Sequence, residues 1–137
     1  MVKLIASKEG TGKTKRIIDM ANERLSNTTG NVVFIDDDKK HIYQLKHDMR
    51  FISMDEYPIR NHDEFVGFIC GVISNNFDIR DVFIDGLNKV THLPSEALPG
   101  VMARFDELSK NFGIDFTMTL TCEGTALPES VKGYLAD

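Results

Sequence analysis

Four residues near the start of the chain have the types and spacing of a phosphate-binding loop. Gly10, Gly12, Lys13 and Thr14 lie within "SKEGTGKT", residues 7–14. The two glycines let a backbone curl so that successive N–H groups point inward at phosphate oxygens. Lys13 can then reach the β- and γ-phosphates, and the Thr14 hydroxyl can bind Mg²⁺. The segment therefore predicts a site for a nucleotide and its magnesium ion.

Carboxylates follow two other apolar segments. Asp85 ends "DVFID", residues 81–85, and "NVVFI" leads into Asp36, Asp37 and Asp38. A carboxylate at such a strand end can hold Mg²⁺, usually through water, and Asp85 is expected in that role. Asp36 or a neighbour could contact the metal or orient water. The alternative for Asp85 is that Asp85-Gly86 only forms a turn. The alternative for Asp36 to Asp38 is that they cap a helix in contact with solvent.

The rest of the chain alternates between buried-strand patterns and amphipathic-helix patterns. The expected strands are residues 2–6, 31–36, 50–54, 81–85 and 114–121. The expected helices are residues 13–25, a segment from the capping pair Asn61 and Glu64 to Ile73, residues 99–113, and a short closing helix at 128–135. The polar residues 37–49 could hold one further short helix.

Continuous apolar strands that alternate with helices are typical of a parallel sheet that is buried on both faces. We expect a three-layer α/β fold with a mostly parallel sheet of about five strands. Ligands of such sheets bind beyond the carboxyl ends of the strands. The glycine-rich segment, Asp36 and Asp85 all belong to strand ends of that kind, so they are expected to share one edge of the sheet.

Bulk composition limits the classes of function. The 137 residues suit one domain, residues 1–137, and the formal net charge of −5 argues against a nucleic acid as the main partner. No apolar run approaches the ~20 residues of a membrane helix, and no targeting segment is visible, so a cytoplasmic location is expected. Cys70 and Cys122 are expected to be reduced, buried thiols. Five phenylalanines at helical spacing are expected in the core: Phe65, Phe68, Phe77, Phe105 and Phe112.

Residues 2–16 together with residues 81–86 resemble the Walker A and Walker B motifs of P-loop NTPases. The resemblance implies a P-loop NTPase fold, bound ATP and Mg²⁺, and catalytic roles for Lys13 and Asp85. It also implies that the phosphates are lined by Gly10, Thr11, Gly12, Lys13, Thr14 and Lys15. In size and pattern the whole chain is similar to small bacterial ATP-binding proteins described as twitching-motility, or PilT-like, proteins.

The segment "KEGTGKT", residues 8–14, is also similar to the deviant Walker A motif K-G-G-x-G-K-[ST] of the MinD/ParA family, with Glu9 as the one departure. Lys8 falls where that family places a lysine that reaches the nucleotide of a dimer partner. This resemblance implies a homodimer or another protein partner. The alternative is that Lys8 is an ordinary exposed loop lysine.

Two absences bear on the expected activity. Gly86 follows Asp85, where many ATPases have the glutamate that activates water. The possible substitutes are Glu9, Asp36 to Asp38, and Glu123, so the sequence predicts a slow ATPase or a nucleotide-dependent switch. The alternatives are a small-molecule kinase and a nucleotide-binding module that never hydrolyses. Asn88-Lys89 is not followed by the aspartate of the guanine-specifying motif N-K-x-D, which favours ATP over GTP. Residues 122–127, after the last strand, are expected near the nucleobase.

Overall fold

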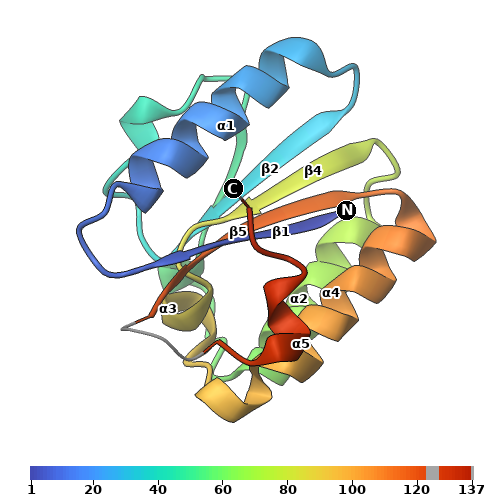
Figure 1. Ribbon diagram of the computed structural model, residues 1–137. Helices are drawn as coiled ribbons and strands as arrows, with labels where there is room; N and C mark the ends of the chain where they lie inside the picture. The colour runs from blue at the N-terminus through green and yellow to red at the C-terminus, as the bar shows by residue number, and fades with distance from the viewer. Residues whose placement is uncertain (123–126, 137) are drawn as a thin grey trace.

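The computed structural model describes residues 1–122 and 127–136. It shows a five-stranded sheet in which every pair of neighbouring strands is parallel, in the order β1-β5-β4-β2-β3. The strands are β1 Val2–Ser7, β2 Asn31–Asp36, β3 Arg50–Ser53, β4 Ile79–Ile84 and β5 Asp115–Thr121. Helices cover both faces of this sheet (Figure 1), so the predicted three-layer α/β architecture is confirmed.

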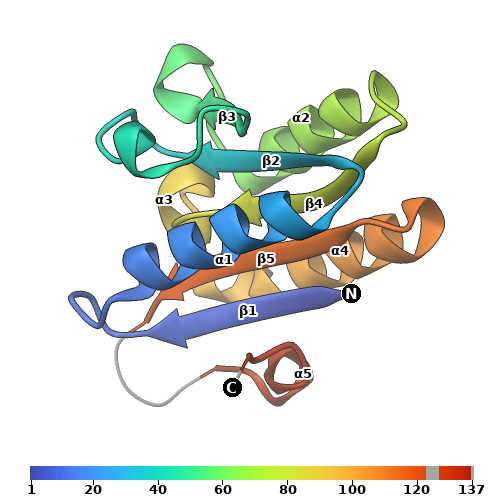
Figure 2. The same cartoon turned by 90° about the horizontal axis from the view of Figure 1, so that it is seen from above.

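The two helical layers are unequal. On one face α1, Lys13–Asn27, packs Ile17, Ile18 and Ala21 against side chains of β2 and β4. The other face carries the remaining helices, which are α2 His62–Ser74, α3 Leu87–Thr91, α4 Leu98–Phe112 and α5 Glu129–Lys132. Figure 1 shows the sheet between α1 and this larger layer, and Figure 2 shows the strands side by side with α1 in front of them. Because both faces are covered, the strands need apolar side chains on both sides, which is why they appear as continuous apolar runs.

Several local predictions are confirmed in detail. The Asn61 side chain caps α2, accepting a hydrogen bond from the Glu64 backbone N–H at 2.9 Å. Gly113 ends α4 with a φ of 66°, a left-handed conformation that glycine adopts without strain. The helix predicted at residues 13–25 continues two residues further, to Asn27.

The irregular segments differ most from expectation. Helix α3 was not anticipated, because its five residues are too few to display a helical period. Strand β4 begins at Ile79 rather than at residue 81, and α5 covers only part of the predicted residues 128–135. The short helix that residues 37–49 were expected to allow is a three-residue 3₁₀ helix, Ile42–Gln44. Similar turns lie at Met54–Glu56 and Ser95–Ala97.

Two of the expected core aromatics lie at the surface. Phe77 is 93% exposed and Phe112 is 56% exposed, so their assignment to the core was wrong. Phe77 lies beyond the end of α2, in the turn before β4, where helical spacing no longer determines its direction. Phe112 is the last residue of α4. The expected burial of Cys70 was also wrong, because this free thiol is exposed.

The C-terminal segment covers the outer edge of β1. The Leu4 N–H donates to the Tyr134 carbonyl at 2.7 Å, and the Ala136 N–H donates to the Leu4 carbonyl at 2.9 Å. This parallel bridge occupies backbone groups that an edge strand otherwise leaves unpaired. Among the described residues, no helix has the length and apolar character needed to cross a membrane.

Candidate functional site

The sheet topology determines which strand ends meet. Because all strands are parallel, the carboxyl ends of β1, β2 and β4 lie along one edge of the sheet. Strand β5 lies between β1 and β4, so one strand separates the glycine-rich loop, residues 8–12, from Asp85. Thr119 and Thr121 of β5 line the space between them.

The glycine-rich loop needs glycine at two positions. Gly10 has a φ of 80° and Gly12 a φ of 85°, and a Cβ built on either residue would meet no atom within 4 Å. The glycines therefore serve the backbone conformation and leave open space above the loop. At Ser7, where the motif usually has glycine, the residue ends β1, and its φ is not positive. A serine is therefore compatible with the loop.

Lys13 lies back across the loop. Its Nζ donates to the Ser7 carbonyl at 3.1 Å and to the Lys8 carbonyl at 2.7 Å. Thr11 Oγ1 also donates to the Lys8 carbonyl at 2.8 Å, and it lies 2.5 Å from Ser7 Oγ. The ammonium group thus lies over the loop, where a phosphate oxygen would compete with carbonyl oxygens for its protons.

A pocket of about 240 Å³ joins the loop to the end of β4. It brings together five residues that the sequence predicted to bind phosphate or metal: Gly10, Gly12, Lys13, Thr14 and Asp85. Its other lining residues are Glu9, Gly86, Lys89, Thr119 and Thr121. We call this the loop pocket. It contains an ammonium group, hydroxyl groups, a buried carboxylate and glycine backbone, which are the groups that bind phosphate with a hard cation.

Three other predicted phosphate-lining residues lie elsewhere. The Lys15 Nζ pairs with Asp19 at 2.6 Å on the exposed side of α1. Lys8 and Thr11 line a separate pocket of about 360 Å³ on the other side of the loop, which Cys122, Leu127 and Lys132 complete. Residues 123–126 lie outside the described residues. They include Glu123 and most of the segment, residues 122–127, that was expected near the nucleobase.

Asp85 is held in place by Thr119. The Thr119 Oγ1 donates to Asp85 Oδ1 at 2.8 Å and accepts from the Gly86 N–H at 2.6 Å. All of these groups are buried, and Asp85 is 8% exposed. Since Thr119 engages one carboxylate oxygen, it orients the Asp85 side chain at the wall of the loop pocket.

Asp36 lies at the neighbouring strand end and is more deeply buried. It is 3% exposed, and its Oδ1 accepts from the Asp37 N–H at 2.8 Å. Its Oδ2 is buried without a hydrogen-bond partner among the described residues. Burial above all, with contributions from Asp37 and the charge of Asp85, raises the pKa of Asp36 to about 8. Asp38 instead accepts from the Lys40 N–H at 2.9 Å, as a turn-capping residue does.

The residues present fit a magnesium ion that arrives with phosphates. In the described part of the chain, no three His, Cys, Asp or Glu side chains gather into a site that could hold a metal. Mg²⁺ is usually held by only one or two carboxylates, with water and substrate phosphates as its other ligands. Thr14 and Asp85 both line the loop pocket, and the unpartnered Asp36 oxygen lies at the same sheet edge.

Sequence reasoning missed three residues of the loop pocket: Lys89, Thr119 and Thr121. The threonines carried a signal, because Thr117, Thr119 and Thr121 alternate with apolar residues and so share one face of β5. The sequence carried no signal for Lys89, because its position depends on the short helix α3, which was not predicted.

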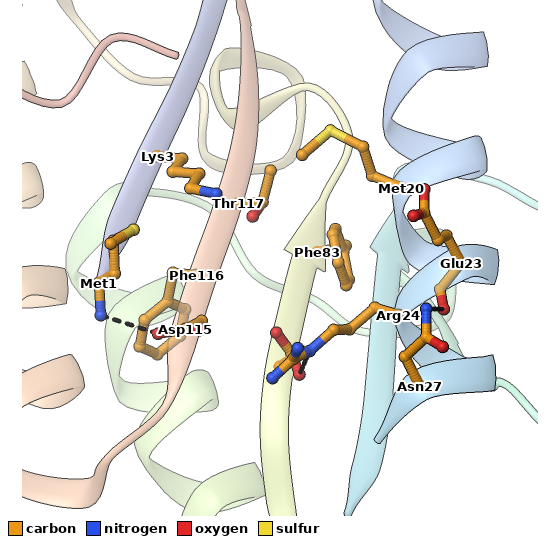
Figure 3. Close-up of a pocket in the computed structure, with 11 residues that line it drawn as sticks. Met1, Lys3, Met20, Glu23, Arg24, Asn27, Phe83, Asp115, Phe116 and Thr117 are labelled. Carbon is orange, nitrogen blue, oxygen red and sulfur yellow. Dashed lines mark hydrogen bonds and ion pairs between the residues drawn. The ribbon is translucent and has the colours of Figure 1, made fainter.

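A further pocket, of about 250 Å³, lies at the amino ends of the strands. Figure 3 shows Lys3, Arg24 and Thr117 around it, and the Met1 amino group paired with Asp115 at 2.9 Å. At this end of the sheet Arg24 Nε also pairs with Asp81 Oδ2 at 2.7 Å. Charges of both signs are paired here, and no glycine lines the pocket, so it lacks the phosphate-binding features of the loop pocket.

No known protein family matches the sequence, and a search of curated proteins finds no similar chain.

Proposed function

We propose that the protein is an ATP- and Mg²⁺-binding P-loop protein that acts as a slow ATPase or a nucleotide-dependent switch. The observation that carries the proposal is the loop pocket, in which Gly10, Gly12, Lys13 and Thr14 face Asp85 across β5. These residues come from segments far apart in the sequence. A glycine-rich turn that served only to begin α1 would not account for their convergence.

Each residue has a distinct role in this proposal. The loop N–H groups and Lys13 bind the phosphates, with Lys13 exchanging its carbonyl partners for phosphate oxygens. Thr14 and Asp85 would hold Mg²⁺, which neutralises charge on the phosphates, and Thr119 keeps Asp85 oriented. Asp36 is a candidate for a further metal contact.

The proposed turnover is slow because nothing equivalent to a water-activating glutamate follows Asp85. Glu9 lines the loop pocket but belongs to the exposed loop, while Asp38 caps a turn. In the ligand-free protein burial raises the pKa of Asp36 to about 8, which disfavours the ionised form that a base needs, whereas a nearby Mg²⁺ would favour the ionised form as a metal contact. We infer that nucleotide state mainly alters contacts with another protein or a second copy of the chain, in the cytoplasm.

The test is ADP formation by the purified protein with ATP and Mg²⁺. The proposal predicts turnover well below the ~10 per second typical of enzymes, and its loss in Lys13→Ala. Lys3→Ala is the matched control, since it removes a lysine at the opposite end of the sheet. ADP formed only when nucleosides or small metabolites are added would indicate a kinase instead. Binding without any ADP would indicate a non-hydrolysing module.

A further inference from the structure

The loop pocket contains a second lysine that the proposed function leaves without a role. Lys89, on α3, lines the same cavity as Lys13, Thr14 and Asp85. Its side chain is exposed, and it makes no hydrogen bond or ion pair with any other residue that the structure describes. An ammonium group that lines a phosphate pocket and pairs with none of the described residues is available to bind an anion.

Gly86 leaves the space that the Lys89 side chain crosses. A Cβ added to Gly86 would lie 3.1 Å from Lys89 Cδ and 3.4 Å from its Cβ and Cγ. The aliphatic stem of Lys89 therefore packs over the Gly86 backbone. The aliphatic part of the Lys89 side chain therefore fills the space into which a glutamate at position 86 would project.

The backbone that carries Lys89 is firmly held. Leu87 and Thr91 of α3 are fully buried, and the Lys89 N–H donates to the Gly86 carbonyl at 2.9 Å. Asn88 joins α3 to the end of β5, because its side-chain amide donates to the Thr121 carbonyl and accepts from the Thr121 N–H. Only the exposed end of the Lys89 side chain is left to reorient, which lowers the entropy lost when it binds a ligand.

The two lysines of the loop pocket come from different segments of the chain. One wall is the loop itself, with its N–H groups and Lys13, and the opposite wall is Asp85, Gly86 and Lys89. In the proposed binding mode, phosphates held against the loop would leave oxygens of the terminal phosphate inside the pocket that Lys89 also lines. A diphosphate lacks that group.

We propose that Lys89 binds the terminal phosphate of a nucleoside triphosphate and so makes the site distinguish the triphosphate from the diphosphate. This inference rests on the proposed nucleotide site. It gives the switch a residue that senses whether the terminal phosphate is present, attached to a short helix that is tied to both β4 and β5.

The experiment is calorimetric titration of the purified protein with ATP and with ADP, each with Mg²⁺, at two salt concentrations. In Lys89→Ala, ATP affinity should fall about ten- to a hundredfold, as expected for one charge-assisted contact, while ADP affinity changes less than about twofold. The salt dependence of ATP binding should weaken as well. Lys89→Arg should preserve most of the ATP preference, and Lys3→Ala should leave both affinities unchanged.

The outcomes separate this inference from the proposal on which it rests. If Lys13→Ala abolishes binding but Lys89→Ala keeps the wild-type ratio of ATP to ADP affinity, the role of Lys89 is refuted and the nucleotide site stands. Equal losses of ATP and ADP affinity in Lys89→Ala would also refute it. If the wild-type protein binds neither nucleotide, both proposals fail.

Discussion

At the scale of single residues, Thr119 is the group whose loss should be most informative. Its hydroxyl joins two consecutive residues at the end of β4, donating to the Asp85 side chain and accepting from the Gly86 N–H. Both bonds are buried. The residue lies on β5, between the glycine-rich loop and Asp85, and it connects the sheet to the proposed metal ligand.

We expect Thr119→Val to lower the free energy of unfolding by about 1–3 kcal/mol, because valine keeps the shape but leaves a buried N–H and a buried carboxylate oxygen without a partner. Thr119→Ser keeps the hydroxyl and should cost less. Urea denaturation of both variants measures the difference. If Thr119→Val is as stable as the wild type, Thr119 does not hold Asp85 as described.

The raised pKa of Asp36 predicts an unusual dependence of the free energy of unfolding on pH. An unfolded aspartate has a pKa of about 3.9, whereas burial raises the pKa of folded Asp36 to about 8. Between these values the folded protein keeps a proton that the unfolded chain has released. Raising the pH from about 4 to about 8 should therefore lower the free energy of unfolding.

The Asp36→Asn variant isolates this contribution. It should be more stable than the wild type at pH 8.5, by at least about 1 kcal/mol, and the difference should shrink toward pH 5. Asp38→Asn, a neighbour that caps a turn, is the control and should show no such trend. Denaturation curves of the ligand-free proteins at the two pH values decide the question. Parallel pH profiles for wild type and Asp36→Asn would contradict the raised pKa.

At the scale of elements, α1 is held to the sheet at both ends. Its first turn follows Gly12 at the loop pocket, and near its last turn Arg24 pairs with Asp81 of β4. Burial raises the pKa of Asp81 and the Arg24 guanidinium opposes that shift. The helix that begins at the proposed phosphate site is thus fixed by an ion pair at its far end.

Arg24→Ala should lower the free energy of unfolding by about 1–3 kcal/mol, because it leaves the carboxylate of Asp81 buried without its cation. Adding Asp81→Asn in the same chain should recover part of the loss. Lys15→Ala breaks an exposed pair on the same helix and should cost less than about 0.5 kcal/mol. Equal costs for Arg24→Ala and Lys15→Ala, measured by denaturation, would show that burial of the Asp81 pair is unimportant.

The elements show what the sequence could and could not predict. All five strands and the three longer helices were predictable, because each is long enough to show its apolar pattern. Helix α3 was not, and Lys89 was missed with it. The order of the strands in the sheet could not be predicted either, because it depends on tertiary packing. The contact between Thr119 and Asp85 depends on this order, in which β5 lies between β1 and β4.

At the scale of the whole molecule, the position of Lys8 suggests how copies of the chain could interact. Lys8 is exposed and lines the pocket on the side of the loop away from Asp85. It does not line the loop pocket of its own chain. A lysine placed in this way could contact a nucleotide bound to a second copy, as the likeness of residues 8–14 to the MinD/ParA loop implies.

We therefore predict that ATP with Mg²⁺ promotes self-association and that Lys8→Ala abolishes it while leaving ATP binding nearly intact. Sedimentation velocity with and without ATP measures the association. Lys15→Ala, which removes another exposed lysine close to the loop, is the control and should still associate. A protein that stays monomeric with ATP bound would contradict the dimer, and the switch would then need a different partner.

The central claim is that the loop pocket binds a nucleotide, and thermal unfolding with and without ATP and Mg²⁺ tests it most directly. A ligand at a hundred times its dissociation constant adds about 2.7 kcal/mol of stability, which corresponds to a rise in melting temperature of about 8–12 °C for a chain of this size. Lys13→Ala should melt like the wild type without ligand and lose most of that rise. If ATP raises the melting temperature of Lys13→Ala as much as that of the wild type, or raises neither, the loop pocket is not a nucleotide site.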